Sequence, residues 1–242
     1  MSPLLADLRA PRHGPGVCVR CFNFTREPDY ELCYACATGQ HHLDAIAPIA
    51  YSVAHEQLHQ DLVRYKRYAD PWVEMAAARL ALILGRFLAA HEACVAATAG
   101  ATAFDVVTTV PSGQIGRDDH HPLRRIVAEL ITSTAGRHAR VLRRSSAPAQ
   151  RRAFDPARFQ AVRPLGGANV LLIDDTWTTG ASAQSAAAAL KAAGAARVGA
   201  VVIGRHLNRE WFENDQRLRR IAQPLRLSVC ALCAAVPEVE AA

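Results

Sequence analysis

The sequence contains few of the residues that mark several common protein classes. Only Lys66 and Lys191 are lysine among the 28 basic residues, and aromatic residues make up 6% of the chain. No run of about 18 apolar residues occurs, because Arg79 and Arg86 interrupt the best candidate, residues 75–90. The N-terminus lacks a basic start followed by an apolar stretch of about 7–15 residues. We therefore expect no transmembrane span, no membrane partner and no secretory signal, and a cytoplasmic location.

The composition is that of a folded chain. Its 242 residues are 50% hydrophobic, which excludes a disordered tail protein and a collagen-like repeat. This length suits one α/β domain with a small appendage, since single domains typically have about 100–200 residues. The formal net charge is +6, and residues 117–158 alone hold ten arginines against four acids. This excess suits a polyanionic ligand. Nucleic acid is the less favoured partner, because few aromatic residues lie among the arginines.

Six of the seven cysteines form three Cys-x-x-Cys pairs, and in a cytosolic chain this spacing indicates a metal site before a disulfide. Cys18/Cys21 and Cys33/Cys36 are separated by 11 residues. Two such turns supply four thiolates for a tetrahedral shell around Zn²⁺. Redox-active or idle thiols are the alternatives. We predict a structural zinc knuckle within residues 17–44, whose folding depends on the metal.

The third pair, Cys230 and Cys233, has the spacing of a metal site but no remaining Cys-x-x-Cys partner. We therefore expect these thiols to lie in a terminal strand, with a metal or redox role as the alternative. Cys94 lies on an alanine-rich helical stretch, where we expect it to pack as a small hydrophobic residue.

Short apolar runs alternate with helical stretches along the rest of the chain. We expect strands at residues 45–53, 104–110, 139–142, 170–173 and 198–203, and helices at residues 55–69, 72–93, 123–135, 182–193 and 208–223. This alternation is typical of an α/β fold with a parallel sheet. The predicted division is a flexible leader (1–16), the zinc knuckle (17–44), the α/β domain (45–223) and a C-terminal tail (224–242).

The most informative segment is residues 170–182, Val-Leu-Leu-Ile-Asp-Asp-Thr-Trp-Thr-Thr-Gly-Ala-Ser. A buried strand would end at Asp174 and Asp175, and a hydroxyl-rich loop with Gly180 would lead into a helix. Ligands of open α/β sheets bind beyond the carboxyl ends of the strands, and N–H groups at a helix start bind phosphate. The two acids would accept hydrogen bonds from sugar hydroxyls or hold Mg²⁺ through water. A strand–turn–helix corner with incidental acids and a different phosphate or nucleotide site are the alternatives.

This segment resembles the 5-phosphoribosyl-1-pyrophosphate (PRPP) motif of type I phosphoribosyltransferases, in which four apolar residues, two acids and a phosphate loop follow without gaps. The resemblance implies that Asp174 and Asp175 are the active-site acids and bind the ribose hydroxyls. The residues implied to bind the 5-phosphate are Thr178, Thr179, Gly180, Ala181 and Ser182. Trp177 is expected to pack the loop.

The same resemblance implies a second loop, for the pyrophosphate, after the strand at 104–110. The residues expected there are Pro111, Ser112 and Gly113, with Arg117 either in a charge-assisted contact or as an ordinary solvated side chain. Residues 143–158 would form a mobile basic loop that closes over the reactive centre and excludes water, or a disordered charged loop. We interpret His120 and His121 as an exposed polar turn, with a general base as the alternative.

A Cys₄ knuckle, a lysine-containing segment at residues 62–66 and the PRPP motif occur together in the ComF/GntX family, which this chain resembles over residues 17–205. The resemblance implies a parallel-sheet, type I phosphoribosyltransferase-like fold with a small N-terminal zinc knuckle. It also implies a glycosyltransferase that binds PRPP and Mg²⁺, transfers the phosphoribosyl group to an unidentified nitrogen acceptor and releases pyrophosphate. The alternative is a non-catalytic PRPP- or nucleotide-binding accessory protein linked to DNA uptake. Residues 116–123 differ from the family pattern, and the oligomeric state stays open.

Overall fold

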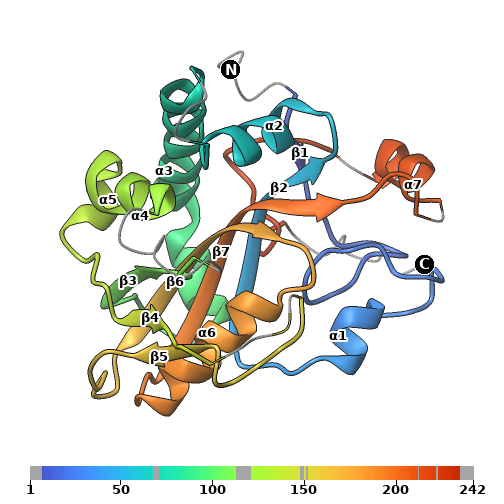
Figure 1. Ribbon diagram of the computed structural model, residues 1–242. Helices are drawn as coiled ribbons and strands as arrows, with labels where there is room; N and C mark the ends of the chain where they lie inside the picture. The colour runs from blue at the N-terminus through green and yellow to red at the C-terminus, as the bar shows by residue number, and fades with distance from the viewer. Residues whose placement is uncertain are drawn as a thin grey trace.

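A four-stranded parallel sheet lies at the centre of the molecule (Figure 1). The computed structural model describes residues 7–67, 71–112, 121–147, 150, 152–211, 213–221 and 223–234. The strand order is β2-β7-β6-β3, and all three neighbouring pairs are parallel. The four strands are β2 (Ala45–Val53), β3 (Val106–Thr109), β6 (Asn169–Trp177) and β7 (Arg197–Leu207). The expected α/β class with a parallel sheet is confirmed.

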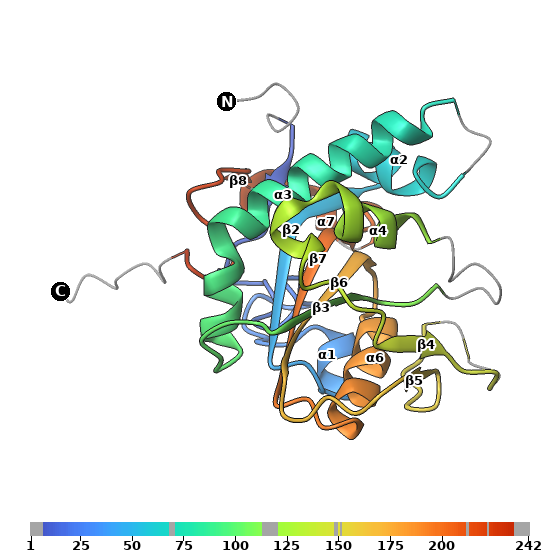
Figure 2. The ribbon, with the colours of Figure 1, turned by 90° about the vertical axis from the view of Figure 1, so that its left-hand side faces the viewer.

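Helices cover both faces of this sheet (Figure 2). On one face lie α2 (Gln57–Arg64) and α3 (Val73–Thr98), with α4 (Pro122–Arg125), the π-helix η2 (Ile126–Leu130) and α5 (Thr132–Ala135) packed beside α3. On the other face lie α6 (Ala181–Ala192) and the antiparallel hairpin of β4 (Leu142–Arg144) and β5 (Phe159–Ala161). Alternate residues of β6 enter the two cores: Leu171 and Ile173 on the α3 side, Val170 and Leu172 on the α6 side. Burial on both faces explains the uninterrupted apolar run of this strand.

The single helix expected at residues 123–135 is wrong, because the chain breaks there into α4, η2 and α5. Ile131 leaves the helical conformation, with φ −115° and ψ 104°. The hydroxyl of Thr134 donates hydrogen bonds to the carbonyl oxygens of Val127 (2.5 Å) and Ile131 (3.0 Å). Threonine hydroxyls that bond to nearby carbonyls compete with the regular helical pattern. The strand expected at 139–142 is also displaced, to β4.

Helix α3 is the one helix among the described residues that is long and apolar enough to cross a bilayer by length and composition. Ten of its 26 residues are buried, and it packs against β2, β7 and η2. Arg79 of this helix lies 3.4 Å from the Asp61 carboxylate of α2. The buried apolar side chains of α3 therefore belong to the core of the folded chain.

The two ends of the described chain lie side by side. Strand β1 (Arg9–Ala10) pairs antiparallel with β8 (Gln223–Pro224), which follows α7 (Asn214–Ile221). Leu8 and Ala10 are buried in the α3-side core, and the Leu225 N–H donates to the Leu8 carbonyl at 2.7 Å. Residues expected in a leader and a tail thus contact one another.

Candidate functional site

The acid pair lies where the sheet opens on one side of β6. Strand β6 continues past the expected end at residue 173 and pairs with β7 as far as Trp177. On its other side, β3 pairs with β6 only up to Ile173, whose carbonyl accepts a hydrogen bond from the Val110 N–H at 3.0 Å. Asp174 and Asp175 therefore follow the last residue that β3 covers. Ligands of α/β proteins bind at this type of position, beyond the carboxyl ends of parallel strands.

Asp175 is buried and held by two residues that follow α2. The Lys66 ammonium lies 2.5 Å from its Oδ2, and the Tyr65 hydroxyl donates to the same oxygen. Burial by itself raises the pKa of Asp175, but the Lys66 charge and the hydrogen bonds from Lys66 and Tyr65 outweigh it and lower the pKa below its ordinary value. Asp175 is thus an ionised, neutralised carboxylate. The expected helix at 55–69 ends early, at Arg64, and leaves these two residues beyond it.

Asp174 is in a different electrostatic state. Its carboxylate is half-buried and accepts a hydrogen bond from the Asp175 N–H at 2.9 Å. Burial, followed by the charge of Asp175, raises the pKa of Asp174 to about 7. Two adjacent carboxyls with the same intrinsic acidity are therefore separated by their surroundings, and Asp174 is the member of the pair that loses its proton last.

The loop after β6 is a tight turn that ends at the start of α6. Gly180 has φ +82° and ψ −1°, the left-handed conformation that glycine adopts without steric cost. A Cβ atom at Gly180 would also lie 2.1 Å from the ring of Trp177, which is buried under the loop. This turn brings residues 178–182 to the amino end of a 12-residue helix, where N–H groups favour an anion. Trp177 packs the loop, as expected.

The segment expected to close over the site contacts this loop directly. Arg158 donates to the Ser182 hydroxyl at 3.0 Å, and the Thr179 hydroxyl donates to the Arg152 carbonyl at 3.2 Å. The Asp155 N–H donates to the Ser185 hydroxyl at 3.0 Å. The hairpin β4–β5 forms the base of the segment. The described residues between 143 and 158 therefore lie beside the candidate phosphate loop.

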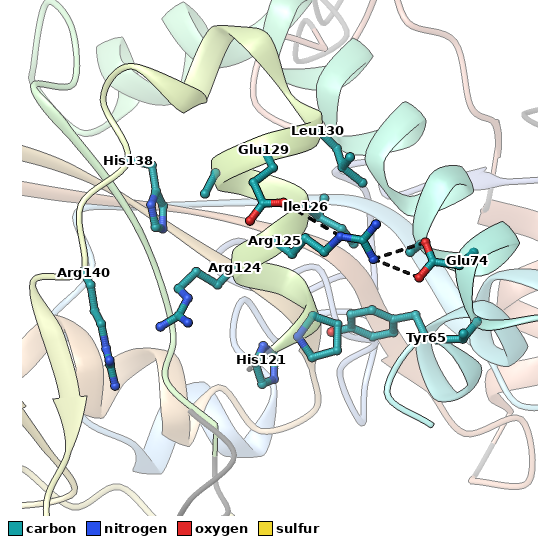
Figure 3. A pocket seen from close by; sticks show the side chains of 14 residues that line it. Tyr65, Glu74, His121, Arg124, Arg125, Ile126, Glu129, Leu130, His138 and Arg140 are labelled. Carbon is teal, nitrogen blue, oxygen red and sulfur yellow. Dashed lines mark hydrogen bonds and ion pairs between the residues drawn. The ribbon is translucent and has the colours of Figure 1, made fainter. Parts of the chain in front are cut away.

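A cavity of about 630 Å³ lies between α3 and the α4–η2 segment (Figure 3). Tyr65 forms part of its wall, so the cavity approaches the residue that donates to Asp175. Its ionisable lining is mainly basic and consists of His121, Arg124, Arg125, His138 and Arg140, with Glu74 and Glu129. The guanidinium of Arg125 lies 2.9 Å from Glu74 and 3.9 Å from Glu129.

The four N-terminal cysteines come together, as predicted, into a buried cluster. The sulfur atoms of Cys18, Cys21, Cys33 and Cys36 all lie within 4.8 Å of one another, and those of Cys21 and Cys33 are 3.6 Å apart. Cys33 precedes the short helix α1 (Tyr34–Thr38), which carries Cys36. These residues could hold a metal ion.

The two histidines that follow the cysteine cluster, His41 and His42, contact groups other than its sulfur atoms. A ring nitrogen of His41 lies 2.8 Å from the Cys36 carbonyl oxygen, and His42 stacks on Phe154 with ring centroids 5.1 Å apart. The backbone N–H groups of His42 and Leu43 both donate to Gln184 of α6. The cysteine segment is thus attached to the helix that begins at the candidate phosphate loop.

Arg205 was missed by sequence reasoning, although it connects the cysteine cluster to the loop. Its side chain is only 2% exposed. Its Nε donates to the Cys21 carbonyl at 2.9 Å, and its Nη1 donates to the carbonyls of Trp177 and Thr178 at 2.9 and 3.2 Å. A guanidinium nitrogen also lies 3.7 Å from the Cys21 sulfur. An arginine within the apolar run of β7 is the sequence signal that could have drawn attention to it.

The structure brings together most of the residues expected to bind PRPP. Asp174 and Asp175, the loop at 178–182, and the start of the second loop at Pro111 and Ser112 all lie at the carboxyl ends of β6 and β3. Gly113, Arg117 and His120 lie outside the described residues. Neither a scan of protein-family models nor a search of curated proteins gives a match for this chain.

Proposed function

We propose that this chain is a type I phosphoribosyltransferase-like protein of the ComF/GntX kind, which binds PRPP with Mg²⁺ and transfers the phosphoribosyl group to a nitrogen acceptor. The observation that carries the proposal is the acid pair at the open flank of β6, followed by the Gly180 turn and, six residues after Asp175, by the start of α6. The carboxylates can accept hydrogen bonds from the hydroxyls of a sugar, and the amino end of the helix can bind a phosphate group of the same ligand.

In this proposal each segment has a distinct task. The N–H groups and hydroxyls of residues 178–182 bind the 5-phosphate, while Asp174 and Asp175 accept hydrogen bonds from the ribose hydroxyls. Lys66 and Tyr65 keep Asp175 ionised and in a fixed position. Residues 111–113, with Arg117, bind the pyrophosphate. The chain contributes mainly positioning and electrostatic stabilisation, and no covalent nucleophile is needed.

The acid pair suits Mg²⁺. Magnesium prefers carboxylate and phosphate oxygens as ligands. Since Lys66 already neutralises Asp175, Asp174 is the carboxylate whose unfavourable charge a dication would offset. Asp174, with the pyrophosphate oxygens of the substrate, would therefore hold the ion. Bound Mg²⁺ would stabilise the negative charge that develops on the departing pyrophosphate.

The cavity beside Tyr65 is the proposed site for the acceptor. It adjoins the acid pair through Tyr65, and its volume of about 630 Å³ is within the range of small-molecule sites. Three arginines, Arg124, Arg125 and Arg140, against two glutamates give its lining a positive formal charge. We therefore infer that the nitrogen acceptor carries an anionic group, such as a carboxylate.

The N-terminal cysteine cluster is proposed to bind Zn²⁺. Four thiolates are soft ligands suited to a tetrahedral zinc ion, and four protein ligands leave no open position for catalysis. The metal would be structural. By holding Cys21 in place it would also hold Arg205, which donates to the carbonyls of the phosphate loop.

A pyrophosphate-release screen tests the proposed reaction. The zinc-loaded chain is incubated with PRPP, MgCl₂ and a panel of nitrogen acceptors, in which each acid-bearing acceptor is paired with a neutral analogue. We expect acceptor-dependent pyrophosphate release, faster with the anionic member of a pair, and abolished in Asp174→Asn/Asp175→Asn. The matched control is Glu213→Gln, which should keep the activity. The Glu213 side chain is 68% exposed and lies away from the site.

Two outcomes would change the proposal. PRPP binding without release on any acceptor favours the non-catalytic accessory protein. Release that is equal in the wild-type chain and in the Asp174→Asn/Asp175→Asn variant contradicts the assignment of the acids.

A further inference from the structure

A second group of metal-binding side chains lies at the opposite end of α3 from Tyr65. His91 and Cys94 are on α3, and Cys230 and Cys233 are on the C-terminal segment, more than 130 residues further along the chain. Their ligand atoms all lie within 4.8 Å of one another. His91 and Cys230 are buried, Cys94 is half-buried and Cys233 is exposed.

We propose that His91, Cys94, Cys230 and Cys233 form a second structural zinc site, which fastens the C-terminal segment to α3. Three thiolates and one imidazole are a ligand set typical of closed, four-coordinate zinc. Cys94 packs against the α3-side core, as expected. The terminal strand expected for Cys230 and Cys233 is wrong, because both residues lie outside any strand. The second pair of ligands is a His-x-x-Cys on a helix, which a search for Cys-x-x-Cys pairs does not find.

The distances fit a tetrahedral ion. With zinc bonds of about 2.3 Å to sulfur and about 2.05 Å to nitrogen, two tetrahedral sulfur ligands lie about 3.8 Å apart, and a sulfur and a nitrogen about 3.6 Å apart. The sulfurs of Cys230 and Cys233 are 3.4 Å apart. The Nδ1 of His91 lies 3.7 Å from the sulfurs of both Cys94 and Cys233. The four groups therefore already surround a volume of the size that zinc requires.

The surroundings prepare these groups for a metal. The Nε2 of His91 lies 2.9 Å from the Leu227 carbonyl oxygen, which makes Nε2 the donor and leaves the Nδ1 lone pair facing the sulfurs. The N–H groups of Cys230 and Cys233 each point at the other residue's sulfur at 3.3 Å and would stabilise thiolate charge. Arg12 reaches the Val229 carbonyl beside the pair at 3.5 Å and adds a positive charge nearby.

Metal counting on the full-length chain tests this site. We expect two zinc ions per purified wild-type chain. Cys230→Ser/Cys233→Ser should hold one, and Cys18→Ser/Cys36→Ser should also hold one, so that failure of either site is distinguished from failure of the other. His55→Asn removes an exposed histidine at φ +69°, a backbone conformation that asparagine tolerates, and should keep both ions.

A spectroscopic measurement keeps the test decisive if a serine variant does not fold. Cobalt-substituted wild-type chain should show the overlapping d–d bands of one S₄ and one S₃N site, and His91→Cys should convert the second set into the S₄ type. One zinc per wild-type chain, or an unchanged zinc content in Cys230→Ser/Cys233→Ser, would overturn the proposal. A disulfide between Cys230 and Cys233 would also overturn the proposal. Mass spectrometry would detect it if these two cysteines are alkylated only after a reductant is added.

Discussion

Asp174 and Asp175 are neighbours in sequence, but their environments shift their pKa values in opposite directions. Asp175 has Lys66 and Tyr65 as partners, whereas Asp174 is half-buried beside a negative charge. The motif predicted both acids as site residues, and they do lie together at the end of β6. It did not predict the difference between them, because that difference depends on residues more than 100 positions earlier in the chain.

The first prediction concerns the stability of the Asp174→Asn variant. The pKa of Asp174 is raised to about 7 in the folded chain. Its contribution to the free energy of unfolding is therefore fully present at low pH, where the carboxyl is protonated, and is lost as the pH rises through 7. Without Mg²⁺, Asp174→Asn should raise the free energy of unfolding at pH 8 by about 1–2 kcal/mol, or Tm by about 2–8 °C. The gain should shrink at pH 5. Thermal unfolding followed by circular dichroism measures both.

Asp175→Asn is the paired variant with the opposite expected sign. The pKa of Asp175 is lowered in the folded chain, so its ionised form contributes stability above its ordinary pKa, and this contribution is lost as the pH falls. Its replacement should lower Tm at pH 8. Equal changes in Tm for the two variants would contradict the assigned difference.

The second prediction concerns Gly180. In Gly180→Ala the methyl group meets the Trp177 ring and the backbone keeps a positive φ, so the turn must rearrange. We expect a loss of about 1–3 kcal/mol in the free energy of unfolding, with weakened PRPP binding. Gly14→Ala is the matched control, since a Cβ there has no atom within 4 Å and the backbone is unstrained. Urea denaturation compares them, and similar losses in both variants would refute the argument.

At the scale of elements, the bounds of a strand or helix are predicted well where the sequence has one clear periodicity. They are predicted poorly where contacts with distant parts of the chain decide where the element ends. The bounds of β2 agree with the expected strand at 45–53, since its apolar run is buried throughout almost its whole length. Strand β6 was expected to end at the acids, yet it continues because β7 pairs with it to Trp177. The helix expected at 123–135 fails because the Thr134 hydroxyl and the Ile131 backbone interrupt the helical pattern.

Arg205 gives the third prediction, which concerns the connection between β7, the cysteine cluster and the phosphate loop. Arg205→Met should leave buried carbonyls of Cys21, Trp177 and Thr178 without their donor. We expect a loss of about 3 kcal/mol or more in the free energy of unfolding, and faster zinc release to a chelator. A colorimetric chelator assay measures the release.

The control for this variant is Arg219→Met. The Arg219 side chain is 74% exposed and pairs only with Asp215 among the contacts described. A surface pair of this kind is worth about 0–1 kcal/mol, so zinc release should not change. Identical release rates for Arg205→Met and the wild-type chain would show that the guanidinium does not support the cluster.

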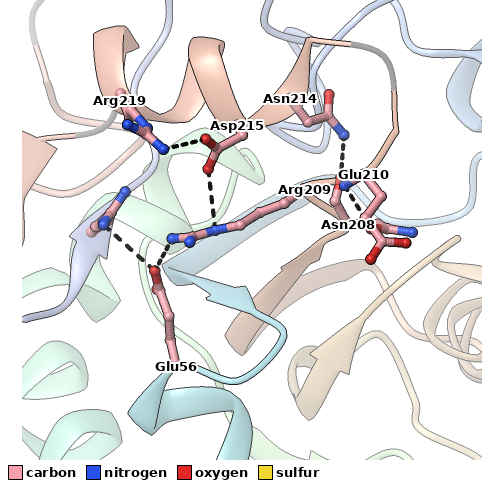
Figure 4. A network of polar contacts seen from close by, with 8 residues as sticks. Glu56, Asn208, Arg209, Glu210, Asn214, Asp215 and Arg219 are labelled. Carbon is pink, nitrogen blue, oxygen red and sulfur yellow. Dashed lines mark hydrogen bonds and ion pairs between the residues drawn. The ribbon is translucent and has the colours of Figure 1, made fainter.

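At the scale of the whole molecule, both ends of the described chain are fastened to the sheet and its helices by polar groups. Glu56, between β2 and α2, binds Arg9 near the N-terminus and Arg209 after β7 (Figure 4). Arg209 also reaches Asp215 of α7, which pairs with Arg219. These contacts, the β1–β8 pair and the group of His91, Cys94, Cys230 and Cys233 join segments that are distant in sequence. Periodicity and motif spacing carry no information about such pairings.

The fourth prediction follows from these attachments. Metal removal should unfold the two cysteine-bearing segments locally, because metal binding contributes much of the folding energy of such segments. The central sheet should stay folded, since local unfolding does not require global unfolding. After chelation, hydrogen exchange should increase within residues 17–44 and 226–234. Amides of β6 and β7 should stay protected. Uniform loss of protection along the chain would contradict this picture.

The most direct test of the central claim is calorimetric titration of PRPP into the zinc-loaded chain in the presence of MgCl₂. We predict saturable binding by the wild-type chain and by the exposed-carboxylate control Glu213→Gln. Affinity should fall by about 10-fold or more in Asp174→Asn/Asp175→Asn, which corresponds to about 1.4 kcal/mol or more. No binding to the wild-type chain, or equal affinity for the wild-type chain and the double variant, would contradict the account.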